Sequence, residues 1–329
     1  MCKKIFIAAT GQHCGKTTTS LSLLHLARKK YNRVGFIKPF GPKRTSYLGQ
    51  FVDIDAALIA HVYGIEDQLE LMSPVVLDSH TTREFLEGKV KPQDYLEKIC
   101  RATSELEKQC DFLIVEGAGH SGVGSVMGLN NAQLAHQLDA PVLMVAGGGV
   151  GNVIDAIQLN LALFRETGAE VRMILPSKLT KSKRESTLKY LQMAFKNTAI
   201  QVVGGFNFSP ILANPTLKHL AELLRLELQG DNEQASRIVH HVQLGAASTQ
   251  RIVELLQEST LIIVPSSRGE VLVTLSTLYP LPEFKNKIAG LVINGVVPLT
   301  EVAQRIIDKA KIPYIRAAET TAEIYTTIQ

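Results

Sequence analysis

The sequence predicts an α/β fold in which a mostly parallel sheet, with helices on both faces, is followed by a second, smaller α/β domain. Continuous apolar runs alternate with helix-like segments, which is typical of parallel sheets buried on both faces. A glycine-bearing loop joins the first apolar run to the first helical segment. The composition then changes at residues 207–216, NFSPILANPT, whose prolines and asparagines indicate a linker.

The first domain is expected to span residues 1–208. Its strands are predicted from apolar runs rich in Val, Ile, Leu and Phe, at 4–9, 34–38, 112–116, 141–146, 171–175 and 200–206. Helices are predicted between them, at 16–30, 53–63, 92–109, 129–138, 150–166 and 181–196. Ligands of such sheets bind at the carboxyl ends of the strands, so the segments that follow the strands are the candidate site.

The second domain is expected to span residues 214–329, where strands and helices alternate again. The predicted helices are 216–226, 248–257, 269–278 and 299–310, and the predicted strands are 238–244, 260–264, 288–293 and 313–316. His240 and His241 are neighbours in a strand-like run, so at most one of them can line a given pocket.

The composition narrows the function classes. The 329 residues carry a net charge of +4, and the basic clusters lack interleaved aromatic residues, which argues against nucleic-acid binding. No apolar stretch reaches the length of a membrane span, and the N-terminus leads into a core strand without a signal peptide. The four cysteines have no metal-ligand spacing, so we interpret them as reduced thiols of a cytoplasmic protein.

The loop after the first strand has the parts of a triphosphate site. Residues 9–18 read ATGQHCGKTT and open a helix. Backbone N–H groups and the positive helix end hold phosphate oxygens, Lys16 reaches the outer phosphates, and the Thr17 hydroxyl can ligate Mg²⁺. The predicted phosphate-binding residues are Thr10, Gly11, Gln12, His13, Cys14, Gly15, Lys16, Thr17 and Thr18. The loop is a variant P-loop because Thr10 replaces the usual first glycine, and it predicts a P-loop NTPase-type sheet.

Charged residues follow two other strands and open one helix. Glu116 ends a buried strand, where it can either hold Mg²⁺ or cap backbone N–H groups. Asp53 and Asp55 open a helix, and either can be its N-cap, but Asp55 can also reach the metal. Lys38 ends the second strand and is either an anion-binding residue or a solvated lysine.

These motifs together resemble a known family. ATGQHCGKTTTSLSLL, GFIKPFG, DIDAA and LIVEGAG resemble dethiobiotin synthetases, in the same order and at similar spacing. In the second domain, ILANPTLKHLAELL, IVPSSRGEVLVTLS and IAGLVINGVVP resemble the DRTGG domain. This arrangement is similar to the N-terminal half of long-form phosphotransacetylases, and the acetyltransferase domain is absent from these 329 residues.

The resemblance implies roles for the residues that match its motifs. Residues 11–18 would hold the phosphates of ATP. The implied Mg²⁺ ligands are Thr17, Asp55 and Glu116. Lys38 matches a lysine that contacts the substrate carbamate, which makes Lys16 and Lys38 the candidate catalytic residues. The DRTGG resemblance implies a homodimer and a small-molecule ligand.

The sequence also departs from the family pattern. Ser177 aligns with the asparagine that reads adenine, which leaves the base open. His13 replaces an acidic residue of the phosphate loop. Residues 267–270, SRGE, replace the DRTGG signature, and Arg268 either marks a ligand pocket or begins a surface helix.

Three functions fit the first domain. The favoured one is a Mg-ATP-binding regulator or nucleotide sensor with at most weak ATPase activity. The alternative is an ATP-dependent ligase that acts on a small diamine or a related substrate. An amidotransferase of the cobyrinate diamide synthase type is disfavoured because no cysteine follows Cys110 to serve as a glutaminase nucleophile.

Overall fold

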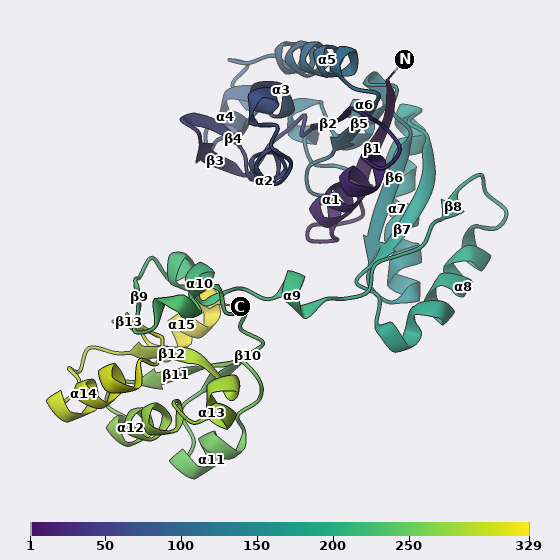
Figure 1. Cartoon of the computed structure of the whole chain (residues 1–329). Coiled ribbons are helices and arrows are strands. Elements are labelled where there is room, and N and C mark those ends of the chain that lie inside the picture. The colour runs from purple at the N-terminus through teal and green to yellow at the C-terminus, as the bar shows by residue number, and fades with distance from the viewer. Residues whose placement is uncertain (1, 329) are drawn as a thin grey trace. The chain divides into compact units, whose positions relative to one another are not determined.

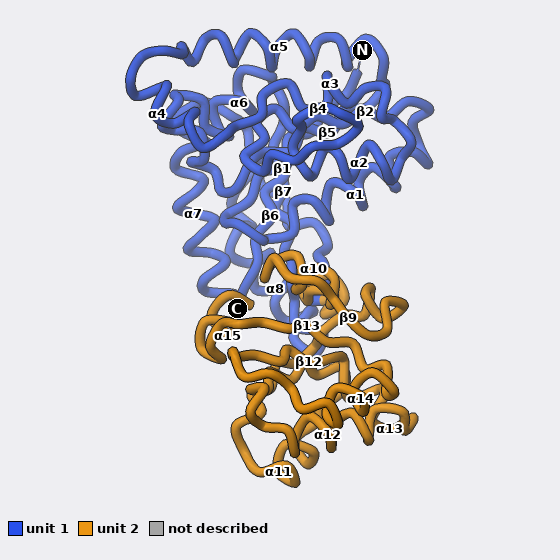
Figure 2. The backbone as a smooth tube through the Cα atoms, turned by 90° about the vertical axis from the view of Figure 1, so that its left-hand side faces the viewer, with its two compact units in different colours: residues 1–208 blue, residues 209–329 orange. Residues whose placement is uncertain are grey.

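The structure is a computed structural model that describes residues 2–328, and the chain divides into two compact units between Phe208 and Ser209 (Figure 2). Each unit has its own sheet and its own hydrophobic core, with helices on both faces of the sheet (Figure 1). The predicted α/β class, with a larger and a smaller sheet, is confirmed.

Unit 1, the residues before Ser209, contains a six-stranded sheet of order β2-β5-β1-β6-β7-β8, and every pairing in it is parallel. Its strands are β1 (Lys3–Ala9), β2 (Val34–Ile37), β5 (Phe112–Glu116), β6 (Val142–Gly147), β7 (Val171–Ser177) and β8 (Gln201–Val202). Because β1 pairs with β5, the phosphate loop and Glu116 emerge at the same edge of the sheet.

Helices cover both faces of this sheet and give unit 1 two cores. One core joins α1 (Lys16–Ala27), α2 (Ile54–Tyr63) and α3 (Leu69–Met72) to the sheet. The other joins α5 (Pro92–Gln109), α6 (Asn131–Gln137), α7 (Val150–Thr167) and α8 (Arg184–Phe195) to the opposite face. The short helix α4 (Thr81–Leu86) precedes α5. The continuous apolar strands follow from this arrangement, because both faces of each strand are buried.

The short helices α3 and α4 were not predicted from the sequence. Two further parts of unit 1 also differ from the prediction. A hairpin of β3 (Arg44–Tyr47) and β4 (Gln50–Asp53) was not predicted, because its turn has positive φ at Leu48 and Gly49, and leucine is not a residue that signals such a turn. The last predicted strand is shorter than expected. The positive φ values of Gly204 and Gly205 turn the chain away after β8.

Unit 2, the residues from Ser209 onward, contains a five-stranded sheet of order β10-β11-β12-β13-β9. The strands β10 (His241–Leu244), β11 (Thr260–Pro265), β12 (Ile288–Asn294) and β13 (Tyr314–Ala317) are parallel, and β9 (Leu228–Gln229) is an antiparallel edge. Alternate residues of β11 enter different cores, with Ile262 and Val264 on one face and Leu261 and Ile263 on the other.

The helices of unit 2 also lie on both faces of the sheet. One face packs on α11 (Thr249–Glu254), α12 (Gly269–Leu278) and α14 (Glu301–Ala310). The other packs on α10 (Leu217–Leu224) and α15 (Thr321–Ile328). A short helix, α9 (Pro210–Ala213), lies within the predicted linker, and α13 (Pro282–Lys287) precedes β12. The strand β9 and the helices α13 and α15 were not predicted, because two short elements and a terminal helix give little periodic signal.

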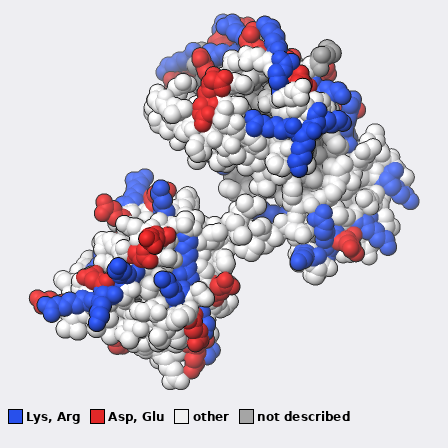
Figure 3. Space-filling model, viewed as in Figure 1, with Lys and Arg blue, Asp and Glu red and all other residues white. Residues whose placement is uncertain are grey.

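Two further properties bear on the expectation that the chain binds neither membranes nor nucleic acids. Among residues 2–328, no helix has both the length and the apolar character needed to cross a bilayer. On the face drawn in Figure 3, basic and acidic side chains are interspersed over both units.

Candidate functional site

The phosphate loop connects the carboxyl end of β1 to the first turn of α1. Gly15 precedes the helix with a φ of 97°, and a Cβ atom at this position would come within 2.9 Å of the Ser177 hydroxyl. His13 also has a positive φ of 55°. Of the predicted phosphate-binding residues, Gln12 and His13 are exposed and Lys16 is buried. The others are partly exposed: Thr10, Gly11, Cys14, Gly15, Thr17 and Thr18. The loop residues 10–15 are therefore at least partly accessible to solvent, whereas Lys16 is buried.

Lys16 is 8% exposed, and its Nζ donates to the Gly119 carbonyl oxygen at 2.5 Å. Burial, together with the positive charge of Lys38, lowers the pKa of Lys16. A buried ammonium at the start of a helix that follows a glycine loop favours an anionic ligand, since its partner here, the Gly119 carbonyl oxygen, carries no net charge.

Lys38 lies between two acidic side chains from different elements. Its Nζ is 2.7 Å from Asp55 Oδ2 and 2.7 Å from Glu116 Oε1, and the lysine is 2% exposed. Burial opposes the charge of this ammonium, but Glu116 and Asp55 outweigh it and raise the pKa of Lys38 above its usual value. Burial also works against the charge of Asp55, but Lys38 holds the pKa of Asp55 below its usual value. The solvated alternative for Lys38 is therefore wrong.

Hydroxyl groups of α1 complete this cluster. The Thr17 hydroxyl donates to Asp55 Oδ1 at 3.0 Å and to Glu116 Oε1 at 3.3 Å. The Ser20 hydroxyl donates to Glu116 Oε2 at 2.5 Å. Thus α1, α2 and β5 bring the three predicted metal ligands together. Ser20 was not predicted, although its position one turn after Lys16 and Thr17 was the available signal.

Asp53 and Asp55 have different roles in the structure. Asp53 is the N-cap of α2, and its Oδ1 accepts from the Asp55 N–H at 2.9 Å. Its Oδ2 accepts from the Lys43 N–H, and its own N–H donates to the Ser73 hydroxyl. Asp53 is fully buried, and burial raises its pKa. The capping interpretation therefore holds for Asp53, whereas the side chain of Asp55 faces Lys38 and Thr17.

The segment after Glu116 is fixed by a residue that the sequence analysis missed. Asn131, in the first turn of α6, accepts from the Ala118 N–H at 3.0 Å and donates to the carbonyl oxygens of Ala118 and His120. A Cβ atom at Gly117 would come within 2.6 Å of Asn131 Oδ1. Asn131 thus holds the loop whose Gly119 carbonyl accepts from Lys16.

The donor set at this edge fits a magnesium triphosphate. No group of three or more His, Cys, Asp or Glu residues within 2–328 is arranged to hold a metal ion. Mg²⁺ needs fewer protein ligands, since it keeps several waters and binds through one or two carboxylates together with phosphate oxygens. Asp55, Glu116 and the Thr17 hydroxyl supply oxygen ligands of this kind beside the phosphate loop.

The candidate ligand residue of unit 2 has a structural role. Arg268 donates to the carbonyl oxygens of Gly245, Ala246 and Ala247 at 3.1, 3.2 and 3.0 Å. Its Nε donates to Glu270 at 2.6 Å. These bonds fasten the turn after β10 to the start of α12, so the guanidinium is largely occupied.

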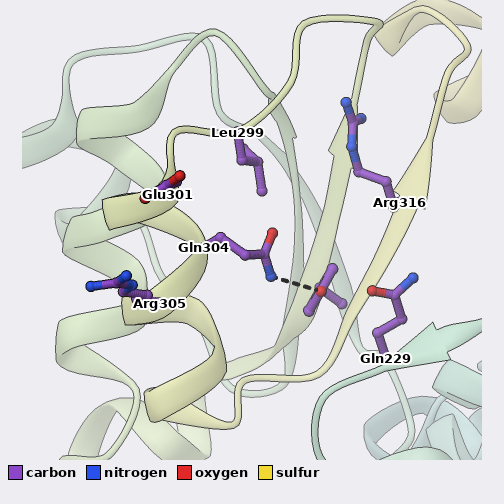
Figure 4. A pocket seen from close by; sticks show the side chains of 7 residues that line it. Gln229, Leu299, Glu301, Gln304, Arg305 and Arg316 are labelled. Atoms are coloured by element: carbon purple, nitrogen blue, oxygen red, sulfur yellow. Dashed lines mark hydrogen bonds between the residues drawn. The ribbon is translucent and has the colours of Figure 1, made fainter.

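A cavity of about 510 Å³ lies between α14 and the strands β13 and β9 of unit 2 (Figure 4). Gln304 Nε2 donates to the hydroxyl of the buried Tyr314 at 3.2 Å, and in Figure 4 the side chain of Leu299 points toward Gln304. The cavity is lined by Gln229, Leu299, Glu301, Gln304, Arg305, Tyr314 and Arg316. Arg316 is held by the carbonyl oxygens of Ile293, Val297 and Ala317. The lining thus combines two carboxamides and a phenol with the charged side chains of Glu301, Arg305 and Arg316.

The two histidines of unit 2 have different surroundings, but the predicted strand 238–244 begins only at His241, so His240 lies before β10 and not within it. His240 lines a second cavity, of about 590 Å³, at the amino ends of the strands, whereas His241 is exposed at the start of β10. The Arg237 guanidinium at this cavity donates to the Ser259 hydroxyl and the Asn286 carbonyl oxygen.

Most of this chain can be aligned with proteins of similar sequence. A phosphate acetyltransferase of Nitrosomonas europaea is 23% identical over 280 residues, which are 82% of this chain and 39% of that protein. An ATP-dependent dethiobiotin synthetase of Methanococcus vannielii is 25% identical over 208 residues, which are 62% of this chain and 92% of that protein. This chain therefore spans about two fifths of the length of the phosphate acetyltransferases that it matches.

A solved structure and two family models add to these relatives. A putative plasmid partition protein of Borrelia burgdorferi bound to AMPPNP is 16% identical with a TM-score of 0.41, over 63% of this chain and 86% of that one. Residues 219–329 match the DRTGG domain. The resemblance to a synthetase-like P-loop domain followed by a DRTGG domain is thus confirmed. Since residues 3–216 match the family described as an AAA domain, the chain belongs to that family.

Proposed function

We propose that unit 1 binds Mg-ATP and that the chain acts as a nucleotide-dependent regulator with at most slow ATP hydrolysis. The observation that carries this proposal is the cluster at the carboxyl edge of the sheet. There the Thr17 hydroxyl contacts both Asp55 and Glu116, one residue after the buried Lys16. Mg²⁺ bound there would neutralise phosphate charge and orient the outer phosphates.

The residues of the chain supply the rest of the binding. The loop residues 10–15 present backbone N–H groups, and Lys16 exchanges its hydrogen bond with the Gly119 carbonyl for phosphate oxygens. Lys38 is a second cation at the same edge, already paired with Asp55 and Glu116. In the absence of Mg²⁺ it offsets the charge of both carboxylates and keeps them within reach of Thr17.

Unit 2 supplies the regulatory part of the proposal. The favoured place for its small-molecule ligand is the cavity that Gln304, Tyr314 and Gln229 line, since the guanidinium of Arg268 is occupied by carbonyl oxygens. We also propose that the chain is a homodimer formed through unit 2, and that its four free cysteines belong to a cytoplasmic protein.

A ligase of the dethiobiotin synthetase type remains the second candidate. It is favoured by the buried ammonium of Lys38 beside the metal ligands and by the relatives with that activity. The presence of unit 2 favours the regulator, because a ligase that acts on a small substrate has no need for it.

A turnover assay separates the two candidates. The full chain is incubated with Mg-ATP, and phosphate release is measured with and without bicarbonate and a vicinal diamine. The regulator releases phosphate more slowly than about 1 s⁻¹, the lower end of the range of enzymes, and neither addition changes the rate. Carboxylation of the diamine in stoichiometric amounts with phosphate release would contradict the regulator proposal and support the ligase.

A further inference from the structure

A pair of thiols lies far from the nucleotide site and has no part in the proposed function. The Sγ atoms of Cys2 and Cys110 are 3.1 Å apart, although 108 positions separate the two residues in the chain. A disulfide bond is ~2.05 Å long, so the sulfur atoms are about 1 Å from bonding distance. We propose that Cys2 and Cys110 form an oxidation site that closes into an intramolecular disulfide.

The fold of unit 1 brings the two cysteines together. Cys2 immediately precedes β1 and Cys110 lies just before β5, and these strands pair in parallel from Lys3 and Phe112 onward. The Lys3 N–H donates to the Asp111 carbonyl oxygen at 2.9 Å, so the pairing continues to the residues beside both thiols. Continued by one residue, this register places Cys2 opposite Asp111, so Cys110 is its diagonal neighbour across the paired strands. The 3.1 Å between the two Sγ atoms shows that the side chains bridge this offset.

The packing of Cys110 directs its sulfur toward Cys2. Cys110 is 7% exposed and belongs to the core beneath α5. A Cβ atom at Gly35 of β2 would come within 3.2 Å of Cys110 Sγ, so the glycine leaves the space that this sulfur occupies. Cys2 packs against the same core but remains partly exposed. An oxidant therefore meets Cys2 first, and Cys110 is the buried thiol that resolves the product.

Hydrogen peroxide is the oxidant class for which the step is written. The Cys2 thiolate attacks one peroxide oxygen, an S–O bond forms, the O–O bond breaks, and hydroxide leaves as water after protonation. Cys110 then attacks the Cys2 sulfur, the S–S bond forms, and the S–O bond breaks with release of a second water. Two thiols lose two electrons in all, and one peroxide is reduced to two waters.

The surroundings of the two thiols keep the fraction of reactive thiolate small. Burial raises the pKa of the Cys2 thiol, and burial together with the hydrogen bond to Cys2 raises the pKa of the Cys110 thiol. The thiolate is the reactive form, so both thiols react slowly at neutral pH.

The disulfide would fasten the amino ends of two central strands. The phosphate loop and Glu116 lie at the opposite ends of β1 and β5, roughly 20 Å away at ~3.3 Å per residue. Oxidation should therefore stabilise unit 1 without changing nucleotide affinity. The bridge closes a long segment of chain, which is the situation in which a cross-link constrains the unfolded state most.

The test uses the full chain, reduced and then exposed to hydrogen peroxide or diamide, with free thiols alkylated before mass analysis. The expected product is a single chain, not covalently joined to another, that is 2 Da lighter and keeps two alkylatable thiols. It yields a linked peptide of Cys2 and Cys110 and returns to the reduced mass with dithiothreitol. Its melting temperature should rise by roughly 5–15 °C and fall again on reduction.

Variants separate this pair from the other cysteines. Cys2→Ser and Cys110→Ala should abolish the mass loss. Cys100→Ser is the matched control, because Cys100 packs against the same core but is not the partner of either thiol, and it should keep the mass loss. The proposal is overturned if neither oxidant gives the linked peptide in the parent, if Cys2 instead forms covalent dimers, or if the Cys100 variant loses the bond.

Discussion

Lys38 determines the charge state of the candidate magnesium site. Its ammonium is 2.7 Å from the carboxylates of both Asp55 and Glu116, and all three side chains are largely removed from solvent. Removing one member of a buried ion pair leaves an uncompensated charge, which is more damaging than the loss of an exposed pair. The site is therefore built so that a cation, either Lys38 or a metal ion, faces the two carboxylates.

Lys38→Met is expected to lower the free energy of unfolding of unit 1 by about 3–5 kcal/mol at pH 7. Urea unfolding followed by circular dichroism measures the change. Lys89→Met is the control, since Lys89 pairs with Glu87 at the surface and its loss should change stability by less than about 1 kcal/mol. Equal effects of the two substitutions would mean that the pairing at Lys38 does not stabilise the fold.

The same variant should reverse the pH dependence of stability. In the parent, Lys38 holds the pKa of Asp55 below its ordinary 3.8, so the stabilisation by Asp55 is present above that pH and is lost as pH falls through the folded value. In Lys38→Met that opposing charge is gone, and burial raises the pKa of Asp55 in the folded state. The variant should therefore gain stability between pH 7 and pH 5, where this cluster leaves the parent unchanged. Urea unfolding of the parent and of Lys38→Met at pH 7 and pH 5 measures this difference. The same change in stability for both proteins would contradict the pairing of Lys38 with Asp55.

Glu116→Gln should weaken the Mg²⁺-dependent part of nucleotide binding and leave metal-free binding nearly intact. The amide keeps the size of the side chain, but its single oxygen can accept from only one of Thr17 and Ser20, which donate to different oxygens of Glu116, and it is a poorer ligand for a hard cation. Titration of nucleotide at several Mg²⁺ concentrations measures the difference. Equal nucleotide affinity of the variant and the parent at every Mg²⁺ concentration would mean that Glu116 is only a hydrogen-bond acceptor at the end of β5.

The sequence could predict the residues of this cluster but not their pairing. The spacing of ATGQHCGKTT and the position of Glu116 at a strand end indicated the site, because strand ends of a parallel sheet meet at one edge. Asp53 and Asp55 could not be separated, since both open the same helix and only the structure shows which one caps it. The position of Lys38 between two carboxylates could not be predicted, because Asp55 and Glu116 lie 17 and 78 positions further along the chain. No local sequence pattern contains contacts over such separations.

At the scale of elements, α6 holds the backbone beside the candidate phosphate site, and none of its residues is a candidate ligand. Asn131 makes three hydrogen bonds to the backbone of the segment after β5, and that segment provides the carbonyl partner of Lys16. Nothing in the sequence marked Asn131, because one asparagine at the start of a helix is common and its partners lie in a loop of irregular shape. The hairpin of β3 and β4 escaped prediction for a similar reason, since its turn lacks the usual Asn-Gly signal.

Asn131→Ala tests this support. Leaving the buried N–H of Ala118 and two carbonyl oxygens without their partner should lower stability by about 1–3 kcal/mol and weaken nucleotide binding, because the loop beside Lys16 loosens. Thermal unfolding and a nucleotide titration measure both effects. The exposed Gln137→Ala on the same helix should change neither. A fully stable Asn131 variant with normal binding would show that the loop is fixed by other contacts.

At the scale of the whole molecule, each unit has the sheet and cores that an independent domain needs. Unit 2 buries apolar residues on both faces of its own sheet, including Ile262, Val264, Leu261 and Ile263 of β11. The division was visible in the sequence as a stretch with two prolines, whereas the short edge strand β9 was not, because two residues carry no periodicity.

A fragment of residues 209–329 is expected to fold alone, to be dimeric and to lack ATPase activity. Circular dichroism, analytical ultracentrifugation and phosphate release measure the three properties. If the units are coupled in the full chain, a ligand of unit 2 that alters ATP affinity must have its own affinity altered by the same factor in the presence of ATP. A monomeric fragment would remove the proposed dimer contact from unit 2, and an unfolded one would contradict the independence of the unit.

The central claim is that the loop 10–18 of unit 1 binds a magnesium triphosphate, and a thermal melt of the full chain tests it most directly. At a concentration 100 times its dissociation constant, Mg-ATP adds about 2.7 kcal/mol to the folded state, and each kcal/mol raises the melting temperature of a domain of this size by roughly 2–4 °C. We predict a rise of several degrees for the parent and none for Lys16→Ala. The absence of any rise with ATP, GTP and CTP, or an equal rise in the Lys16 variant, would contradict the account.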